Sequence, residues 1–402
     1  MYREEFNMEN KNDLKPEKVS FGEKFVNGVK DFGVNTVDYF KNLPANFVNF
    51  WKNWGKNFYN NFTSWHNAKE FILNNLLYIL ILLFVIFVSV KNVRFVSFNN
   101  IINIINQSFF YMPIALGIGG IIVLTGTDLS AGRVVGLTSC ITASLLQAST
   151  YPNKMWGFDF GSLGAWWFIV VLLLVVAIGA IVGFVNGFMV SKFQLHPFIV
   201  TLGTQLIVYG LCLYFITLGA NDGKPIGGIR DDFTEIITGP MFTIGNTRIQ
   251  WYLLYVIILI FAMSFLWNRT KLGKNMFAVG CNPDAATVNG ISVMKTTILV
   301  FVVAGAIYGF NGWISSAYVG SNNATTGQNF ELDAIAACVI GGVSFTGGIG
   351  KIKGIVMGVF LLQIINAAFV FLGITPAMTF IVKGAIILFA CAVDMRKYIT
   401  RR

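Results

Sequence analysis

The sequence predicts an all-α polytopic membrane protein with about ten transmembrane helices, within a range of about eight to ten. Of its 402 residues, 55% are hydrophobic and only 12% are charged, and the mean hydropathy is +0.65. A soluble domain of this size could not bury so much apolar surface. Apolar runs of roughly twenty residues recur after residue 70, and each can cross a hydrocarbon layer of roughly 30 Å.

The N-terminal part of the chain has a different composition. Residues 1–70 mix charged residues with recurring aromatic residues in an Asn-rich background, as in NFVNFWKNWGKNFYNNF. Trp and Lys side chains in this pattern suit the headgroup region of a membrane. We therefore expect residues 1–70 to form a cytoplasmic or membrane-surface amphipathic extension, with a loosely ordered tail as the alternative. Residues 71–402 are expected to form the transmembrane domain.

Apolar segments follow one another through this domain. We expect membrane segments at 71–90, 100–125, 133–149, 165–190, 198–218, 251–268, 296–315, 332–346, 351–372 and 376–393. The segments 133–149 and 332–346 are short and interrupted by glycine, which predicts broken or re-entrant helices. The connections assigned to the cytoplasm carry more Lys and Arg than the outer ones, and the chain ends in RKYITRR. Both termini are therefore expected in the cytoplasm.

Two connections are too long to be simple turns. Residues 219–249, on the outer side, have the Gly, Asp and Pro content of a surface excursion that a partner could contact. Residues 269–295, on the inner side, form a loop that contains the sequence NPDAATVNG.

The inner loop carries signals for a short helix. Asn282 is placed to cap it, Pro283 and Asp284 suit its first turn, and Gly290 follows its end. A helix of about two turns is marginal in water, because most helical stability comes from packing. It either packs against its own membrane domain alone or transmits motion from a docked cytoplasmic subunit.

Motifs for catalysis are missing from the sequence. The Gly-Lys pairs in GKPI, GKNM and GKIK lack the Ser or Thr and the glycine-rich turn of a phosphate-binding loop. The five cysteines show no metal-ligand spacing, and there are only two histidines. We expect no enzyme activity, no cofactor and no metal in this chain. The net charge of +10 is explained by orientation against the membrane, so nucleic-acid binding is not expected.

Two charges stand in the glycine-rich sequence TGTDLSAGR. A charge at the centre of a bilayer costs at least about 2.5 kcal/mol, so Asp128 and Arg133 must face a cavity, a partner or the interface. In one interpretation the turn of a broken helix lines the transport path. In the other, Asp128 caps the next helix and Arg133 only holds the orientation. The candidates in this stretch are Thr125, Gly126, Asp128, Ser130 and Arg133.

A second glycine cluster, GGVSFTGGIG, occupies residues 341–350 and shares a Thr-Gly pair with the first. Thr346 lies within it, and Glu331 and Asp333 stand before it. These carboxylates either cap a helix start, where the dipole favours them, or contact the substrate. Polar residues inside membrane segments, among them Asn186, are further candidates, although interhelical hydrogen bonds are their usual role.

Long combined strings carry a family resemblance. TGTDLSAGR, LGKNMFAVGCNPDAATVNG, ELDAIAACVIGGVSFTGGIG and IVKGAIILFACAVDMRKY resemble the membrane subunit of ribose/xylose/galactose-type ABC sugar importers, and within that family the galactose/methyl-galactoside permeases. The resemblance runs from about residue 71 to the C-terminus. Residues 1–70 depart from the family pattern, in which the first membrane segment lies nearer the start.

The resemblance implies a permease subunit in a bacterial plasma (inner) membrane that translocates galactose or a methyl-galactoside. Its implied partners are a second copy of the chain, a cytoplasmic ATPase with two nucleotide-binding cassettes, an extracytoplasmic sugar-binding protein and membrane lipid. ATP and magnesium would be bound by the partner ATPase. The helix in loop 269–295 would be the coupling element, comprising Asn282, Pro283, Asp284, Ala285, Ala286 and Gly290.

The main alternative is an ion-coupled secondary sugar transporter. Such a protein needs an intramembrane carboxylate for coupling and no partner subunits. The capped cytoplasmic helix and the ambiguous buried acids of this chain favour the ABC permease. A membrane scaffold without transport is disfavoured, because glycine-broken segments make poor simple anchors.

Overall fold

The computed structural model describes residues 79, 81–244, 247–385 and 388. The predicted extension 1–70 and the C-terminal sequence RKYITRR lie outside the described residues, so both stay predictions.

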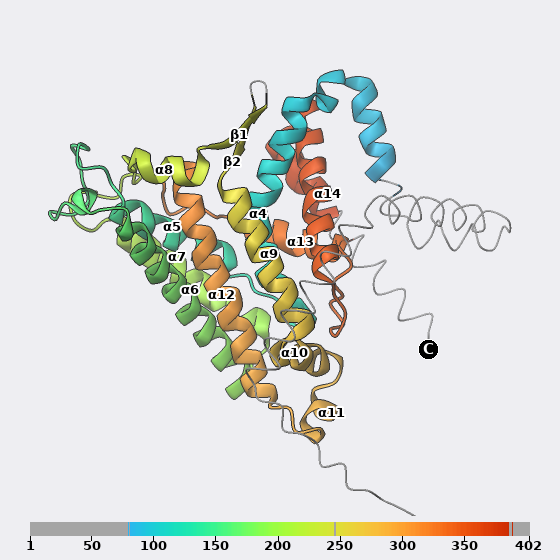
Figure 1. The fold of residues 1–402 in the computed structure, drawn as a ribbon. Coiled ribbons are helices and arrows are strands. Elements are labelled where there is room, and N and C mark those ends of the chain that lie inside the picture. The colour runs from blue at the N-terminus through green and yellow to red at the C-terminus, as the bar shows by residue number, and fades with distance from the viewer. Residues whose placement is uncertain (1–78, 80, 245–246, 386–387, 389–402) are drawn as a thin grey trace, which may run out of the picture. The chain divides into compact units, whose positions relative to one another are not determined.

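The described residues form mainly helices (Figure 1). In chain order they are the helix Ile81–Lys91, η1 (Val93–Val96), α4 (Phe98–Val123), α5 (Ala131–Leu145), η2 (Phe160–Ser162), α6 (Trp166–Lys192), α7 (Pro197–Ile216), α8 (Asp231–Thr238), α9 (Tyr252–Arg269), α10 (Lys271–Cys281), α11 (Pro283–Val288), α12 (Val293–Val319), α13 (Phe330–Ile340) and α14 (Ile352–Phe371). Residues 376–385 are also helical. Two strands, β1 (Pro240–Ile244) and β2 (Thr247–Gln250), stand between α8 and α9.

Six described helices, α4, α6, α7, α9, α12 and α14, are long and apolar enough to cross a membrane. The helix Ile81–Lys91 and α5 are shorter apolar helices. Each predicted membrane segment therefore contains a helix among the described residues. The prediction of a mostly helical polytopic protein is confirmed, whereas the number of spans and the positions of the termini stay predictions.

The connection 219–249, which the sequence assigns to the outer side, differs from the prediction of an all-α fold. It holds the helix α8 and an antiparallel hairpin in which Phe242 pairs with Ile249. The glycine and proline content of this connection indicates turns, and it gives no sign of the two strands, which have five and four residues. Strand pairing depends on which segments meet in space, so composition alone could not predict it.

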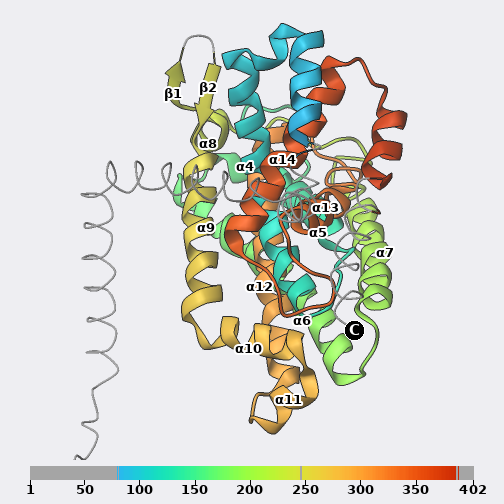
Figure 2. The same cartoon turned by 90° about the vertical axis from the view of Figure 1, so that its right-hand side faces the viewer.

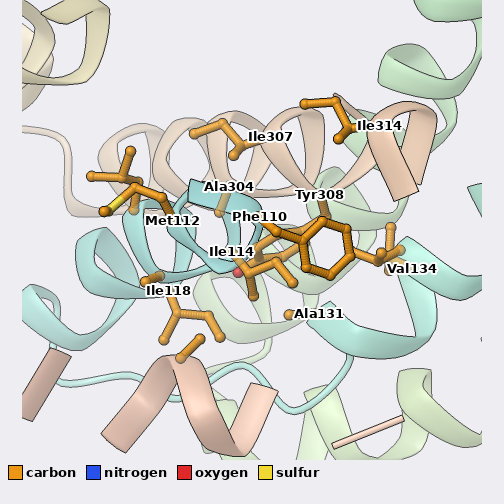
Figure 3. Packing of buried hydrophobic residues seen from close by; sticks show 14 of the residues in the cluster. Phe110, Met112, Ile114, Ile118, Ala131, Val134, Ala304, Ile307, Tyr308 and Ile314 are labelled. Carbon is orange, nitrogen blue, oxygen red and sulfur yellow. The ribbon is translucent and has the colours of Figure 1, made fainter. Parts of the chain in front are cut away.

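The core lies around α12, which packs against α4, α5 and α6. Figure 3 shows Phe110, Ile114 and Ile118 packed among residues of the neighbouring helices. Every residue of α4 from Met112 to Val123 is buried. A helix that is buried on all sides lies inside a bundle, so α4 is a central helix of this domain.

Glycines bring α6 and α12 into backbone contact. A Cβ on Gly179 or Gly183 would collide with the carbonyl oxygens of Gly305 or Phe301, and a Cβ on Gly309 would collide with that of Val175. Small residues at this four-residue spacing let transmembrane helices approach closely. The two longest described helices are thereby held side by side (Figure 1).

The polar elements gather at two opposite ends of the described domain. Figure 2 shows α8 and the β1–β2 hairpin at one end and α10 and α11 at the other. These ends correspond to the two long connections that the sequence assigns to opposite sides of the membrane.

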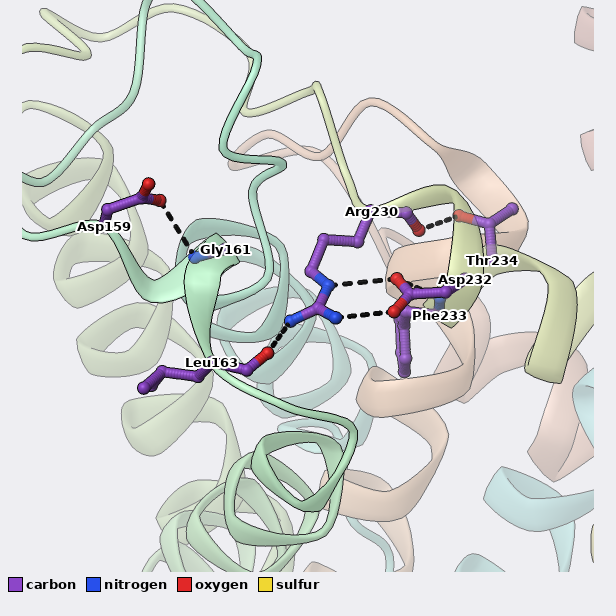
Figure 4. A network of polar contacts seen from close by, with 7 residues as sticks. All are labelled: Asp159, Gly161, Leu163, Arg230, Asp232, Phe233 and Thr234. Carbon is purple, nitrogen blue, oxygen red and sulfur yellow. Dashed lines mark hydrogen bonds and ion pairs between the residues drawn. The ribbon is translucent and has the colours of Figure 1, made fainter.

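Arg230 anchors α8 to the neighbouring loop (Figure 4). Its guanidinium donates to both carboxylate oxygens of Asp232, at 2.9 and 2.5 Å, and to the carbonyl of Leu163. It also lies 4.7 Å from the ring centre of Phe168. The hydrogen bonds from Arg230 hold the pKa of Asp232 below its ordinary value. The stabilisation from this pair is therefore present at neutral pH and is lost as the pH falls through that lowered pKa.

The glycine contact between α6 and α12 gives a first prediction. Gly179→Ala should reduce the amount of folded protein, because its methyl group must push α6 away from the backbone of α12. Size-exclusion chromatography of a fluorescent fusion measures the folded fraction. Gly203→Ala is the matched control, since no atom lies within 4 Å of a Cβ at that helical position, and alanine favours a helix by about 1 kcal/mol over glycine. Equal abundance of the two variants would contradict the prediction.

Candidate translocation and coupling sites

The short helix predicted in loop 269–295 is present as α11. The Asn282 side chain caps it by accepting a hydrogen bond of 3.0 Å from the Ala285 amide. Pro283 is its first residue, and Gly290 follows its end with a φ of +76°. Ala286 is buried, whereas Asp284 is exposed and Val288 is 89% exposed. The helix therefore presents most of its surface outward from the domain.

The end of α10, the helix before α11, and the second glycine cluster both touch the end of α4. The Gly348 amide donates to the Val123 carbonyl at 2.9 Å, and a Cβ on Gly280 would collide with that same carbonyl. A Cβ on Gly347 would collide with Thr125. The two glycine clusters of the sequence and the end of α10 therefore meet backbone to backbone. We call Val123, Gly280 and Gly348 the glycine junction.

The predicted break in the helix lies between α4 and α5. α4 ends at Val123 and α5 begins at Ala131. Thr125 adopts a left-handed conformation with a φ of 62°, and Gly126 packs against Ile121 and Pro197.

Asp128, Ser130 and Asn186 form one buried polar network. The Ser130 amide and hydroxyl both donate to Asp128 Oδ1, at 2.9 and 2.6 Å. Asn186 donates to the Ser130 hydroxyl at 3.0 Å, and Thr204 donates to Asn186 at 2.6 Å. The Tyr308 side chain lies beside the Asp128 carboxylate. The network connects the turn before α5 to α6 and α7. The residue directly before α5 is Ser130, so the bonds from Ser130 to Asp128 close a turn that precedes the helix and do not cap the amides of its first turn.

Arg133 is engaged by the loop before α13. Its guanidinium donates to the Ala324 carbonyl at 3.1 Å and lies 4.2 Å from the ring centre of Tyr209. Glu331 is 4% exposed, and its Oε2 has no hydrogen-bond partner among the described residues. A Cβ on Gly132 would collide with this carboxylate. Arg133 and Glu331 attract each other electrostatically without forming a direct ion pair.

Asp333 lies apart from these groups. Lys383 donates to both of its carboxylate oxygens, at 2.8 and 3.0 Å. The Asp333 side chain is 14% exposed and the Lys383 side chain 17%. Thr346 shares a hydrogen bond of 2.8 Å with Ser344 in the second glycine cluster. The predicted path residues therefore fall into separate groups rather than one site.

A cavity of about 490 Å³ opens beside the Asp333–Lys383 pair. It is bounded by α4, the end of α12, the start of α13, α14 and residues 374–383, and its wall includes Tyr111, Tyr318 and Gln363. Sequence analysis selected Asp333 and the polar residues inside membrane segments, but it missed the aromatic wall of this cavity, because aromatic residues within apolar runs are indistinguishable from packing residues. Lys383 was detectable, since it is a lone charge in the apolar run IVKGAIILF. Among the described residues, no cluster of three His, Cys, Asp or Glu side chains could hold a metal ion.

Together, the helical membrane domain and its polar connections define a polytopic permease. The family model described as branched-chain amino acid transport system / permease component matches residues 100–391. The galactose/methyl galactoside import permease protein MglC of Escherichia coli (strain K12) is 41% identical over 297 residues, which cover 74% of this chain and 86% of that protein. The protein of the same name from Haemophilus influenzae is 39% identical over 297 residues, which again cover 74% of this chain and 86% of that protein.

A more distant relative is the D-allose transport system permease protein AlsC of Escherichia coli, 32% identical over 288 residues that cover 72% of this chain and 81% of that protein. No solved structure matches the chain significantly. The chain belongs to this family of ABC-importer permease components and is a multi-pass protein of the bacterial inner membrane. The family description names amino acids and the relatives are named for sugars, so the substrate has to be argued separately.

The buried network gives a second prediction. Asn186→Leu should lower the thermal stability of the purified protein, because it removes the donor to the Ser130 hydroxyl and leaves the Thr204 hydroxyl without its acceptor, the latter at a cost of about 1–3 kcal/mol. Asn268→Leu is the control, since Asn268 is exposed and bonds only to Ser264 of its own helix. An equal loss of stability in the two variants would contradict the role of the network.

Proposed function

We propose that this chain is the membrane subunit of an ATP-driven importer of galactose or methyl galactoside. The observation that carries the proposal is the similarity to MglC proteins across three quarters of the chain, at 39–41% identity. The presence of α11 within the matched region supports the proposal, since a permease without its own ATP-hydrolysing site needs a surface on which an ATPase subunit can dock.

The proposal includes the topology. About ten membrane segments would place α11 and both termini in the cytoplasm, with α8 and the β1–β2 hairpin outside. The excess of Lys and Arg in the connections on the α11 side supports this orientation. Outside, the end formed by α8 and the hairpin would receive an extracytoplasmic sugar-binding protein.

A cytoplasmic ATPase would dock on α11. The helix turns Asp284 and Val288 outward and buries only Ala286, as a docking element requires. The ATPase, with two nucleotide-binding cassettes, would hold ATP and magnesium, while this chain would form a dimer with a second copy of itself. Two copies would match the two cassettes, so each α11 would meet one of them.

The translocation path would involve the residues that sequence analysis selected. Motion of α11 would reach the Thr125–Ser130 turn through the glycine junction. Gly280 lies at the end of α10, shortly before α11, and it also touches Val123, which precedes the turn. The buried network around Asp128 would then move with α5, α6 and α7. The hydrogen bonds from Ser130 to Asp128 are compatible with this role, because a turn closed by such bonds can still line a path.

Ion-coupled transport is the rival mechanism. Asp333 and Asp128 are disfavoured as coupling carboxylates, because Lys383 holds both oxygens of Asp333 and Ser130 holds Oδ1 of Asp128. Glu331, whose Oε2 has no partner among the described residues, is the carboxylate that such a mechanism would have to use. Proteoliposomes that contain the permease, its ATPase and its binding protein separate the two mechanisms. We expect uptake of labelled galactose that requires ATP and survives an ionophore, and that exceeds uptake of ribose. Uptake driven by an ion gradient without ATP would overturn the proposal.

A third prediction concerns docking of the ATPase. Asp284→Lys reverses a charge on the exposed face of α11, so co-purification of the ATPase should fall severalfold while insertion into the membrane is unchanged. Asp222→Lys, a charge reversal in the loop at the opposite end of the domain, is the control and should retain the ATPase. Normal recovery and normal uptake with Asp284→Lys would exclude α11 as the coupling element.

A fourth prediction tests the glycine junction. Gly280→Ala should lower the amount of sugar carried per ATP hydrolysed, because the added methyl group forces α10 away from the Val123 carbonyl. ATP hydrolysis and uptake are measured together in proteoliposomes. Gly210→Ala on α7 should keep the normal ratio, since no atom lies within 4 Å of a Cβ there. An unchanged ratio in Gly280→Ala would mean that motion passes by another route.

A further inference from the structure

The cavity beside Asp333 has a wall of aromatic rings. Phe110 stacks on Tyr318 with ring centres 4.3 Å apart, and Tyr111 meets Phe330 edge to face at 4.9 Å. The four rings come from α4, α12 and α13 and enclose one side of the cavity. Such a wall offers flat apolar faces that suit the C–H face of a pyranose ring.

The part of the cavity wall that α14 contributes carries amide groups with unused hydrogen-bonding capacity. Gln363 is 1% exposed, and its Nε2 has no partner among the described residues. Asn366 donates to Gln363 Oε1 at 3.1 Å, while its own Oδ1 has no partner there. One donor and one acceptor thus remain open next to each other. Buried polar groups are rarely left unpaired, and a sugar hydroxyl can donate and accept at once.

The charges at the cavity are already matched. The Asp333 carboxylate receives two hydrogen bonds from Lys383, so the pair presents no net charge to a ligand. A free cation would favour the carboxylate of a zwitterionic amino acid and a free anion its ammonium group, and the paired Asp333 and Lys383 offer neither. The carboxylate oxygens can still accept from hydroxyl groups, because each has more than one lone pair.

We propose that this cavity is a binding compartment for an uncharged hexopyranose in the half of the membrane domain that lies away from α11. Its place follows from Tyr318, at the end of α12 remote from α11, and from Gln363 and Asn366 in the later half of α14. The sugar ring lies against Tyr318 and Tyr111, and its hydroxyls bond to the open groups of Gln363 and Asn366. The inference rests on the proposed function for the identity of the sugar as galactose.

Direct occupancy of the cavity is tested with the full-length permease alone. Thr379 lines the cavity, so Thr379→Cys is made in a protein that also carries Cys281→Ser and Cys391→Ser, and its reaction with a small thiol reagent is timed. Galactose at millimolar concentration should slow the labelling at least about twofold, and leucine should not, since only the sugar matches the open groups. Protection by leucine, or by neither compound, would overturn the proposal.

Transport by cavity variants gives the second measurement. Asn366→Leu and Tyr318→Leu should lower galactose uptake by about tenfold. A site that recognises a sugar through its hydroxyl groups loses much of its preference for that sugar when one of the contacting side chains is removed. Tyr318→Phe keeps the ring and should retain most uptake, and Asn268→Leu is the control outside the cavity. ATP hydrolysis stimulated by the loaded binding protein should stay within about twofold in all of them, since docking at the two ends is intact.

The outcomes separate the two proposals. Normal uptake in Asn366→Leu, or a parallel fall in ATP hydrolysis that marks a structural defect, would overturn the cavity as the binding compartment. Protection of the Thr379→Cys thiol by galactose together with no ATP-driven uptake by the wild-type complex would support the cavity and overturn the proposed function.

Discussion

Backbone contact between α6 and α12 is the constraint on which the rest of the domain depends. Lipid is as apolar as a leucine side chain, so helices in a membrane associate through close packing rather than through burial from water. The glycines at 179, 183, 305 and 309 supply that packing. With α12 fixed along α6, its other faces become the surface on which α4 and α5 pack. The core, the broken helix and the cavity are all built on that surface.

The length of α12 connects the two regions to which function is assigned. It has 27 residues and is therefore about 40 Å long. It begins five residues after Val288, the last residue of α11, and reaches Tyr318 in the cavity near its other end. α4 makes a second connection in the opposite direction, from Tyr111 in the cavity to Val123 in the glycine junction. A movement at α11 thus has two continuous helical routes to the cavity, and packed helices transmit shifts because their interfaces are not freely deformable.

The parts of this structure that sequence could predict are those that depend on local pattern. Long apolar runs predicted the helices, and the spacing from Asn282 to Gly290 predicted α11 because capping is a local interaction. The hairpin, the pairing of Asp333 with Lys383 and the meeting of Gly280 with Gly348 depend on residues distant in the chain. For Asp128 the sequence left two roles open. Its hydrogen bonds go to Ser130, the residue before α5, and not to the amides of the first helical turn, so its part in transport stays a prediction.

The polar groups of the domain also bear on what crosses it. An amino acid carries two full charges, and moving it through a membrane domain requires charged partners that are free to exchange. At the cavity, by contrast, Lys383 is committed to Asp333, and elsewhere Arg133 is held by Ala324 and Tyr209. Glu331 keeps a carboxylate oxygen without a partner among the described residues, but it does not line the cavity. What remains open in the cavity wall is a pair of amide groups beside aromatic rings. Such groups bond neutral hydroxyls singly and release them readily, so the compartment favours passage of a sugar over its retention, and tight binding is left to an external protein.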